Sequence, residues 1–234
     1  MRSFDISWEE TYGSSNGKHL NKYPYGQLVT YFFRNKKYLQ NGENSKILEL
    51  GCGAGNNLPL FLNEGYDVYG IDGSKSAINI ARERLKNYNN LNLDVMDFTN
   101  LKYEDNFFDM VIDRESIYAN TPINIEKIYK EINRVLVSGG VFISMMYNIN
   151  DYHFKKIILN DSYAKYIDIN TYTNFKGGTF KGTGIVHFFT KDEVFKLCEE
   201  NNFEILSLSE NISNEIYPKQ MNKVSEYILV AQKR

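Results

Sequence analysis

Three glycines separated by single residues stand in the segment of this sequence whose chemistry is most specific. Gly51, Gly53 and Gly55 follow a short apolar run, and a second strand-like run after them ends at Asp72. Glycines let the backbone turn tightly and approach a ligand that a Cβ atom would exclude. A carboxylate at the end of the second strand can accept hydrogen bonds from both hydroxyls of a ribose. This order of elements predicts a nucleotide-binding βαβ unit over residues 46–72.

The glycine spacing bears on which nucleotide is bound. A dinucleotide fingerprint would place its third glycine at position 56, where this chain has Asn56. Glu49 lies two residues before Gly51, and its carboxylate would repel a diphosphate. The same carboxylate suits a ligand that carries an ammonium group and a sulfonium, as S-adenosylmethionine does. We therefore predict an S-adenosylmethionine site and disfavour a nicotinamide-binding Rossmann protein.

Two segments resemble a known enzyme family. ELGCGAGNN, residues 49–57, closely resembles the first motif of the class I S-adenosylmethionine-dependent methyltransferases. The helix, turn and strand of EINRVLVSGGVFI, with the turn at residues 138–140, match the same family. The resemblance covers residues 46 to about 147 and extends more loosely to the tail. It implies a Rossmann-like α/β fold with a seven-stranded, mostly parallel sheet and helices on both faces.

The resemblance also implies which residues hold the cofactor. In this family an acid after the third strand accepts a hydrogen bond from the adenine amino group, and apolar neighbours sandwich the ring. Asp97 is similar to that acid, with Met96 and Phe98 beside it. We expect cofactor contacts from Trp8, Tyr12, Tyr23, Glu49, Gly51, Gly53, Gly55, Asn56, Asp72, Gly73, Ser74, Met96, Asp97, Phe98, Asp113 and Ser116.

Aromatic residues gather ahead of the first strand. Trp8 and Tyr12 are four residues apart, so on a helix they would share one face. Aromatic faces attract a sulfonium as they attract other cations. We expect a helical lid over the cofactor; the alternative is that these aromatics, and Tyr23, simply cover the sheet.

The acceptor is expected at the end of the fourth strand, predicted at residues 107–112. Ligands of open α/β sheets bind where the strand order reverses, which strands one and four flank. Arg114 would hold an anionic part of the acceptor, although it could equally form a structural ion pair with Asp113. His187 ends the long segment 148–189 and is the candidate base for a hydroxyl acceptor, ahead of His153.

Composition narrows the class of protein. The 234 residues are 42% hydrophobic, enough for one α/β core. A net charge of -2 argues against a nucleic-acid surface, and no apolar run approaches the roughly 20 residues of a membrane span. Without a signal-peptide pattern we expect a cytoplasmic protein with reduced cysteines and no metal site. We expect one domain in four parts: a lid (1–45), a cofactor-binding core (46–147), an acceptor flap (148–189) and a closing helix and strands (190–234).

The predicted function is methyl transfer from S-adenosylmethionine to a small molecule. The chain is similar to a bacterial subgroup associated with small-molecule or surface-sugar modification, so we expect a hydroxyl or amine of a sugar or phosphorylated metabolite in surface-polysaccharide biosynthesis. No nucleic-acid or membrane partner is expected, and the oligomeric state stays open. A protein methyltransferase of the same fold and a non-enzymatic cofactor-binding subunit remain alternatives.

Overall fold

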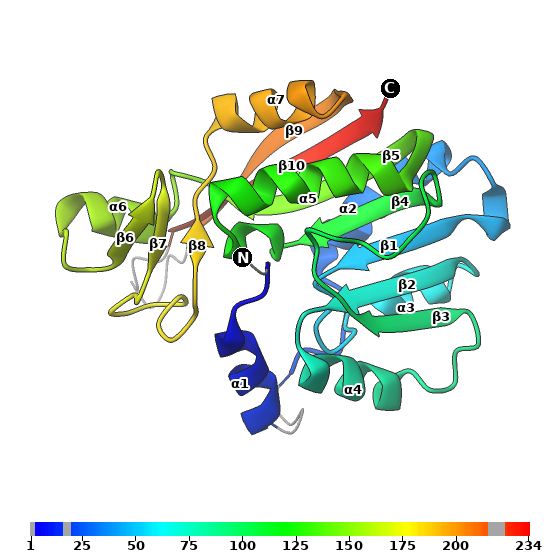
Figure 1. The fold of residues 1–234 in the computed structure, drawn as a ribbon, viewed down its shortest axis with the longest axis horizontal. Coiled ribbons are helices and arrows are strands. Elements are labelled where there is room, and N and C mark those ends of the chain that lie inside the picture. Colours follow the sequence, from blue (N-terminus) through cyan, green and yellow to red (C-terminus); the bar gives the residue numbers. More distant parts are fainter. Residues whose placement is uncertain (1–2, 16–19, 215–222) are drawn as a thin grey trace.

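The computed structural model describes residues 3–15, 20–214 and 223–234. Its main element is a seven-stranded sheet with the strand order β3-β2-β1-β4-β5-β10-β9 (Figure 1). The first five strands of this order are parallel, and β10 is antiparallel to both of its neighbours. This confirms the predicted Rossmann-like sheet. The strands are β1 (Lys46–Leu50), β2 (Asp67–Asp72), β3 (Leu91–Val95), β4 (Phe108–Arg114), β5 (Leu136–Tyr147), β9 (Phe203–Asn214) and β10 (Lys223–Lys233).

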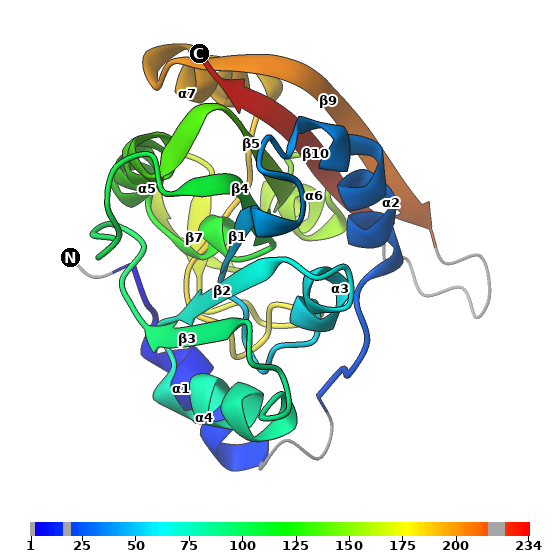
Figure 2. The ribbon, with the colours of Figure 1, turned by 90° about the vertical axis from the view of Figure 1, so that its right-hand side faces the viewer.

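Alternate residues of each central strand enter different apolar cores, because successive side chains of a strand point to opposite faces. On β4, Val111 joins one core, whereas Met110 and Ile112 join the other. Helices cover both faces and bury the two cores (Figure 2). The core of Val111 is covered by α5 (Pro122–Val135) and α7 (Lys191–Glu200), and the core of Met110 by α2 (Gly26–Asn35), α3 (Leu58–Leu62) and α4 (Lys75–Arg84).

Side chains cap the starts of two helices. Ser74 caps α4, since its hydroxyl accepts a hydrogen bond from Ala77 N over 3.0 Å. Thr190 and Glu193 form a capping box at the start of α7.

The predicted turn at residues 138–140 is wrong. Helix α5 runs directly into β5, and Leu136 already pairs with Phe108. The register then shifts, so that Val141 pairs with Met110. The residues between are a bulge in β5 that faces the single partner residue Asp109, and Gly139 adopts φ +76° there.

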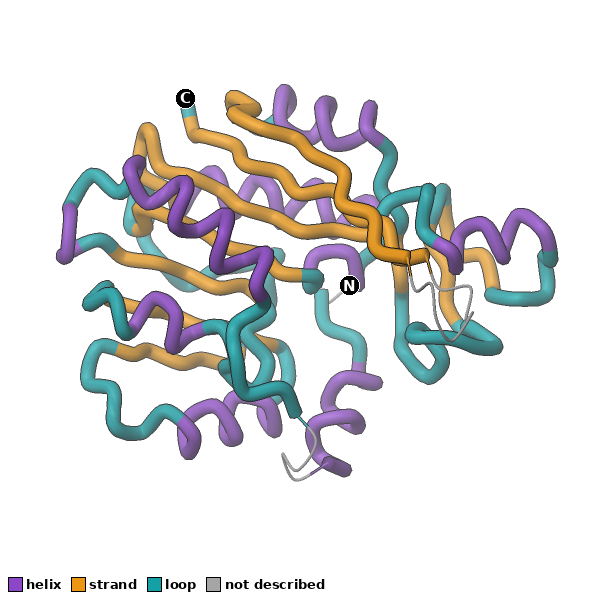
Figure 3. The backbone as a smooth tube through the Cα atoms, turned by 180° about the vertical axis from the view of Figure 1, so that it is seen from behind, coloured by secondary structure: helices purple, strands orange, loops and turns teal. Residues whose placement is uncertain are grey.

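Residues 148–189 form a compact insertion beside the main sheet. It contains α6 (Tyr152–Leu159) and a small antiparallel sheet of β6 (Lys165–Asp168), β7 (Thr171–Thr173) and β8 (Val186–His187). The insertion lies beyond the carboxyl ends of β4 and β5 (Figure 1). Helix α1 (Ile6–Ser15) and the residues before it pass between the insertion and the core, which Figure 3 shows from behind.

Three short 3-10 helices complete the described structure: η1 (Lys36–Tyr38), η2 (Gly42–Asn44) and η3 (Ile117–Ala119). Among the described residues, no helix combines the length and the apolarity that a membrane crossing needs.

Candidate functional site

The glycine turn after β1 leaves no room for side chains. Gly51 and Gly53 adopt φ +66° and +53°, a left-handed conformation that favours glycine. A Cβ atom at Gly51 would overlap the Ser116 side chain, and one at Gly53 would overlap the Tyr12 hydroxyl. Gly55 differs, because a Cβ there would meet Leu85 at 2.9 Å within the apolar core. The spacing G-x-G-x-G therefore combines two glycines that border the site with one required by packing.

Asp72 ends β2 and turns its carboxylate back toward this glycine turn. It accepts hydrogen bonds from Gly53 N over 3.0 Å and from Ser74 N over 2.8 Å. Burial raises the pKa of Asp72 to about 6, and these backbone hydrogen bonds lower it. The carboxylate keeps lone pairs for two ribose hydroxyls, and it is 8% exposed in a cavity wall.

Glu49 is the buried acid of β1. Its Oε1 accepts a hydrogen bond from Asn57 Nδ2 over 2.6 Å, and no described donor reaches its buried Oε2. Burial raises the pKa of Glu49 to about 8, although the Asn57 hydrogen bond lowers it. A buried carboxylate oxygen without a donor is costly, and an ammonium group would satisfy it. Glu49 therefore fits the amino-acid end of S-adenosylmethionine.

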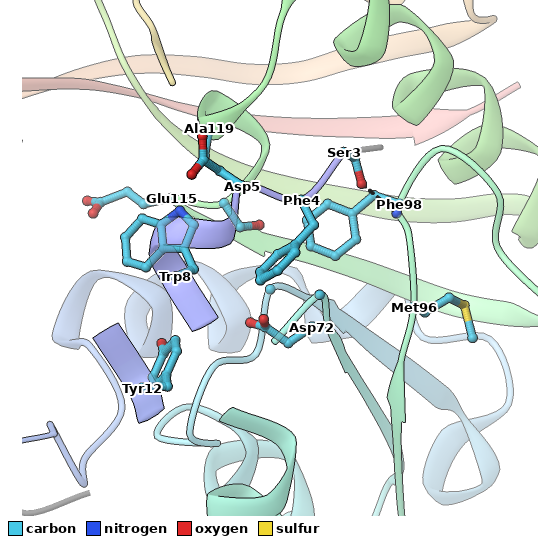
Figure 4. A pocket seen from close by; sticks show the side chains of 13 residues that line it. Ser3, Phe4, Asp5, Trp8, Tyr12, Asp72, Met96, Phe98, Glu115 and Ala119 are labelled. Carbon is cyan, nitrogen blue, oxygen red and sulfur yellow. Dashed lines mark hydrogen bonds between the residues drawn. The ribbon is translucent and has the colours of Figure 1, made fainter. Parts of the chain in front are cut away.

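The residues predicted to bind adenine, Asp97 and Phe98, form hydrogen bonds with the N-terminal segment of the same chain. Ser3 N donates to Asp97 Oδ2 over 3.2 Å, and Phe98 N donates to Ser3 Oγ over 2.9 Å. Phe4 packs against Gly73, where a Cβ atom would overlap its ring. Figure 4 shows Ser3 and Phe4 among the side chains of this cavity. Sequence reasoning did not anticipate either residue there.

Two adjoining cavities surround the turn. The empty space is about 540 Å³ in the first and about 760 Å³ in the second, and both volumes include space open to solvent. The first is lined by Ser3, Phe4, Asp5, Trp8, Tyr12, Gly51, Asp72, Gly73, Met96, Phe98, Glu115, Ser116 and Ala119. The second is lined by Trp8, Tyr12, Tyr25, Gly51, Cys52, Gly53, Asn56, Asn57, Arg114, Glu115, Tyr118, Tyr147, Thr179, Phe180 and Thr183.

Most of the residues predicted to contact the cofactor line one of the two cavities, but six do not. Ten of the sixteen expected cofactor contacts border one or both cavities, and these ten come from five separate segments of the chain. The expected contacts that border neither cavity are Tyr23, Glu49, Gly55, Ser74, Asp97 and Asp113.

Two of these side chains differ sharply in their surroundings. Tyr23 is 76% exposed and borders neither cavity. Asp113 is fully buried and accepts from Ser116 N at 2.9 Å and from Ser144 Oγ at 2.6 Å. Asp113 thus holds the turn after β4, and the ion pair with Arg114 considered from the sequence is not formed: Arg114 pairs with Glu115 at 2.7 Å.

Helix α1 is fastened to the core through Glu9. The Glu9 carboxylate accepts from Ser74 Oγ and from Ser76 Oγ, each over 2.6 Å, at the N-terminus of α4. Hydrogen bonds from the two serines lower the pKa of Glu9, and the helix dipole also favours a negative charge there. This anchor holds Trp8 and Tyr12 in the walls of both cavities.

Arg114 and Glu115 stand where β4 ends. The Arg114 guanidinium lies 3.5 Å from the centre of the Tyr25 ring, and no described acceptor reaches its buried Nε. Glu115 adopts φ +52°, which is uncommon for a residue other than glycine. Its carboxylate accepts from Arg114 Nη1 and, over 2.9 Å, from the Tyr147 hydroxyl. Glu115 lines both cavities, as Trp8, Tyr12 and Gly51 do.

Neither of the two candidate histidines borders the two cavities. His187 is fully buried, with Nδ1 2.8 Å from Thr171 Oγ1 and Nε2 2.9 Å from Glu193 Oε1. It borders neither cavity, so the prediction that it faces the methyl group is wrong. His153 contacts the Tyr163 hydroxyl at 2.9 Å, and burial lowers its pKa to about 4. What the insertion does supply to the second cavity is Thr179, Phe180 and Thr183.

The comparisons with known proteins agree with this geometry. A family model described as a methyltransferase domain matches residues 41–207. The chain belongs to the class I S-adenosylmethionine-dependent methyltransferases. It is therefore an S-adenosylmethionine-dependent enzyme. The glycine turn, Asp72 and Glu49 are chemically suited to this cofactor.

Individual relatives span most or part of the chain. Phosphoethanolamine N-methyltransferase from Plasmodium falciparum is 26% identical over 92% of this chain and 85% of its own length. Demethylmenaquinone methyltransferase from Staphylococcus haemolyticus is 33% identical over 43% of each chain. Among solved structures, a methyltransferase from Methanosarcina mazei superposes with a TM-score of 0.71 at 24% identity, covering 92% of this chain and 99% of that one. Curated relatives thus include methyltransferases whose names give small-molecule substrates.

Proposed function

We propose that this enzyme methylates a nitrogen or oxygen of a small acceptor that also carries an anionic group. The observation that carries the proposal is the junction of the two cavities. Trp8, Tyr12, Gly51 and Glu115 line both, so a ligand held along the glycine turn and Asp72 would adjoin a second ligand. Methyl transfer requires that adjacency, because catalysis here is largely positioning of the acceptor.

The first cavity and two acids close to it would hold the cofactor. Asp72, in the cavity wall, would accept from the ribose hydroxyls. Glu49 and Asp97 lie behind that wall; Glu49 would pair with the ammonium group, and Asp97 with the neighbouring Phe98 would bind adenine. S-adenosylmethionine supplies an electrophilic methyl group on a sulfonium, and the rings of Trp8 and Tyr12 suit that positive charge. These assignments extend the sequence-based expectations with the contacts described above.

The second cavity offers groups for an anion and a cation. Arg114 has a buried Nε without a described acceptor, so a phosphate or carboxylate could take that hydrogen bond. Around it stand the aromatic rings of Tyr25, Tyr118 and Tyr147, which favour a cationic group. Phosphoethanolamine, the substrate named for one relative, combines both charges. A phosphorylated amine is therefore the acceptor class that these residues suit best.

The finer expectations from the sequence stay open. The role in surface-polysaccharide biosynthesis remains a prediction, because none of the contacts above favours a sugar over another phosphorylated acceptor. The lid, core and flap divisions also remain predictions about function. A protein substrate would need an open groove, whereas the second cavity is lined by residues of the lid, the core and the insertion together.

The test is release of S-adenosylhomocysteine against matched acceptors. The panel comprises phosphoethanolamine, free ethanolamine, 2-hydroxyethyl phosphate and a sugar phosphate. We expect turnover with the phosphorylated amine and a higher KM without the phosphate. Arg114→Gln should raise the KM more for phosphorylated acceptors than for free ethanolamine, because its guanidinium is assigned to the anion. Cofactor binding with no turnover of any of these acceptors would contradict the proposed acceptor class.

A further inference from the structure

Glu115 lines both cavities and stands on a turn that the neighbouring strands hold in place. The turn that carries it is fixed on both sides, because Glu115 N donates to Met145 O over 3.0 Å and Asp113 accepts from the next residue, Ser116. The left-handed φ of +52° is a strained conformation for glutamate. Such conformations persist where the surroundings enforce them, and they cluster at functional sites.

A second carboxyl group stands against the first. Glu226 on β10 is 4% exposed, and it lies close enough to Glu115 to raise the pKa of that carboxyl group. Its Oε1 accepts from Asn211 Nδ2 over 3.0 Å, and no described N–H or O–H group donates to Oε2. Two adjacent carboxyl groups do not both ionise readily, so Glu226 disfavours the charged form of Glu115 and raises its pKa.

Three described groups interact with the Glu115 carboxyl group. Arg114 forms an ion pair with Glu115, and the Tyr147 hydroxyl donates a hydrogen bond to Glu115. The charge of Glu115 also raises the pKa of the nearby Tyr118. Burial raises the pKa of Glu115 to about 7; Arg114 and the Tyr147 hydrogen bond lower it, and Glu226 raises it. A carboxyl group of this kind can accept a proton at neutral pH and return it to solvent.

We infer that Glu115 is a catalytic residue that binds the acceptor's ammonium group and takes its proton, with the buried carboxyl group of Glu226 as its neighbour. This inference rests on the proposed function and specifies an amine as the acceptor. One N–H bond breaks and its proton passes to the Glu115 carboxylate, which leaves a lone pair on nitrogen. That pair forms the new C–N bond as the C–S bond breaks, and the electrons of the broken bond remain on sulfur. The product is a methylated ammonium, and Glu115 releases the proton to solvent.

Binding to the S-adenosylhomocysteine complex tests the inference without turnover. Calorimetry would compare phosphoethanolamine with 2-hydroxyethyl phosphate, which has a hydroxyl in place of the amine. The wild-type complex should bind the amine at least tenfold more tightly, and Glu115→Gln should lose that preference while keeping its affinity for S-adenosylhomocysteine. Equal binding of both probes by the wild-type complex would overturn the inference. The methyltransferase assignment would survive that result, because it depends on turnover with any acceptor.

Rate profiles against pH supply the second arm. Below pH about 7 a protonated Glu115 cannot accept a proton, so turnover of the amine should fall as the pH decreases. Glu226→Gln removes a neighbour that raises the pKa of Glu115, so this limb should move to lower pH with activity retained. Glu115→Gln should lower turnover about 10²-fold or more. An unchanged profile in both variants would contradict a proton-accepting role.

A matched glutamate separates this role from general damage. Glu210 on β9 accepts from Asn148 Nδ2 and Ser225 Oγ, and it lines neither cavity. Glu210→Gln should keep the probe preference and the pH profile. Equal losses in Glu210→Gln and Glu115→Gln, with parallel falls in melting temperature, would show that Glu115 acts only on the fold.

Discussion

Ser3 and Asp97, 94 positions apart in the chain, are joined by a hydrogen bond of 3.2 Å from the Ser3 amide to the Asp97 carboxylate. The Ser3 hydroxyl in turn accepts from Phe98 N over 2.9 Å. Ser3 thus donates one hydrogen bond to Asp97 and accepts one from Phe98, just after the end of β3. The amino group and the adjacent ring nitrogen of adenine present the same pair, so Ser3 and adenine would compete for this edge.

The first prediction concerns this competition. Deleting residues 1–4 frees Asp97 and Phe98 but keeps Asp5 and helix α1. We expect affinity for S-adenosylhomocysteine to rise about tenfold, since two hydrogen bonds of about 0.5–1.5 kcal/mol each no longer have to be exchanged. Deleting residues 1–12 also removes Trp8 and Tyr12, so the affinity should fall below that of the shorter deletion. Calorimetry on both proteins distinguishes the two effects; weaker binding after the shorter deletion would mean that Ser3 belongs to the closed site.

The second prediction concerns the ribose. Asp72→Ala leaves two hydroxyls without an acceptor and should weaken S-adenosylhomocysteine binding by roughly 1–3 kcal/mol. It also removes the acceptor of Gly53 N and Ser74 N, so a fall in melting temperature is expected. Asp67→Ala, at the exposed start of the same strand, is the matched control and should bind normally. Unchanged affinity in the Asp72 variant would remove the ribose assignment.

How far the sequence predicted this site depends on how local each feature is. The glycine turn and Asp72 belong to one continuous βαβ unit, so spacing alone located them. Glu115 escaped notice, because its significance depends on Glu226, which lies 111 positions later and reaches it only through the pairing of β5 with β10. His187 was misassigned because its place at the end of a long insertion carries no information about which way its ring points.

The third prediction follows from the buried setting of His187. His187→Ala leaves Thr171 and Glu193 without their ring partner and should lower the free energy of unfolding by about 1–3 kcal/mol. Turnover per folded molecule should be unchanged, because the ring borders neither cavity. Thr171→Val breaks one of the same contacts and should show a smaller effect of the same kind. Denaturant unfolding with parallel kinetics provides the measurement; a selective loss of turnover would restore the histidine to the mechanism.

The last prediction concerns Glu49, whose burial raises its pKa to about 8 in the protein without cofactor. The unfolded chain has a glutamate pKa of about 4.3, so folding takes up a proton between these values. The folded state therefore loses stability as the pH rises from about 5 to 8, and Glu49→Gln should flatten that part of the melting-temperature profile. Asp72 and Glu115, whose pKa values are also raised by burial, contribute the slope that remains.

Cofactor binding should reverse the protonation of Glu49. At pH 7 its carboxyl group is mostly protonated, but an ammonium group against Oε2 favours the carboxylate, so binding should release close to one proton per site. Calorimetry of S-adenosylhomocysteine binding in two buffers of different ionisation enthalpy measures this release. Glu49→Gln should bind more weakly and release almost none. If the variant released as many protons as the wild type, the proton would come from another group, and Glu49 would not be the partner of the cofactor's ammonium.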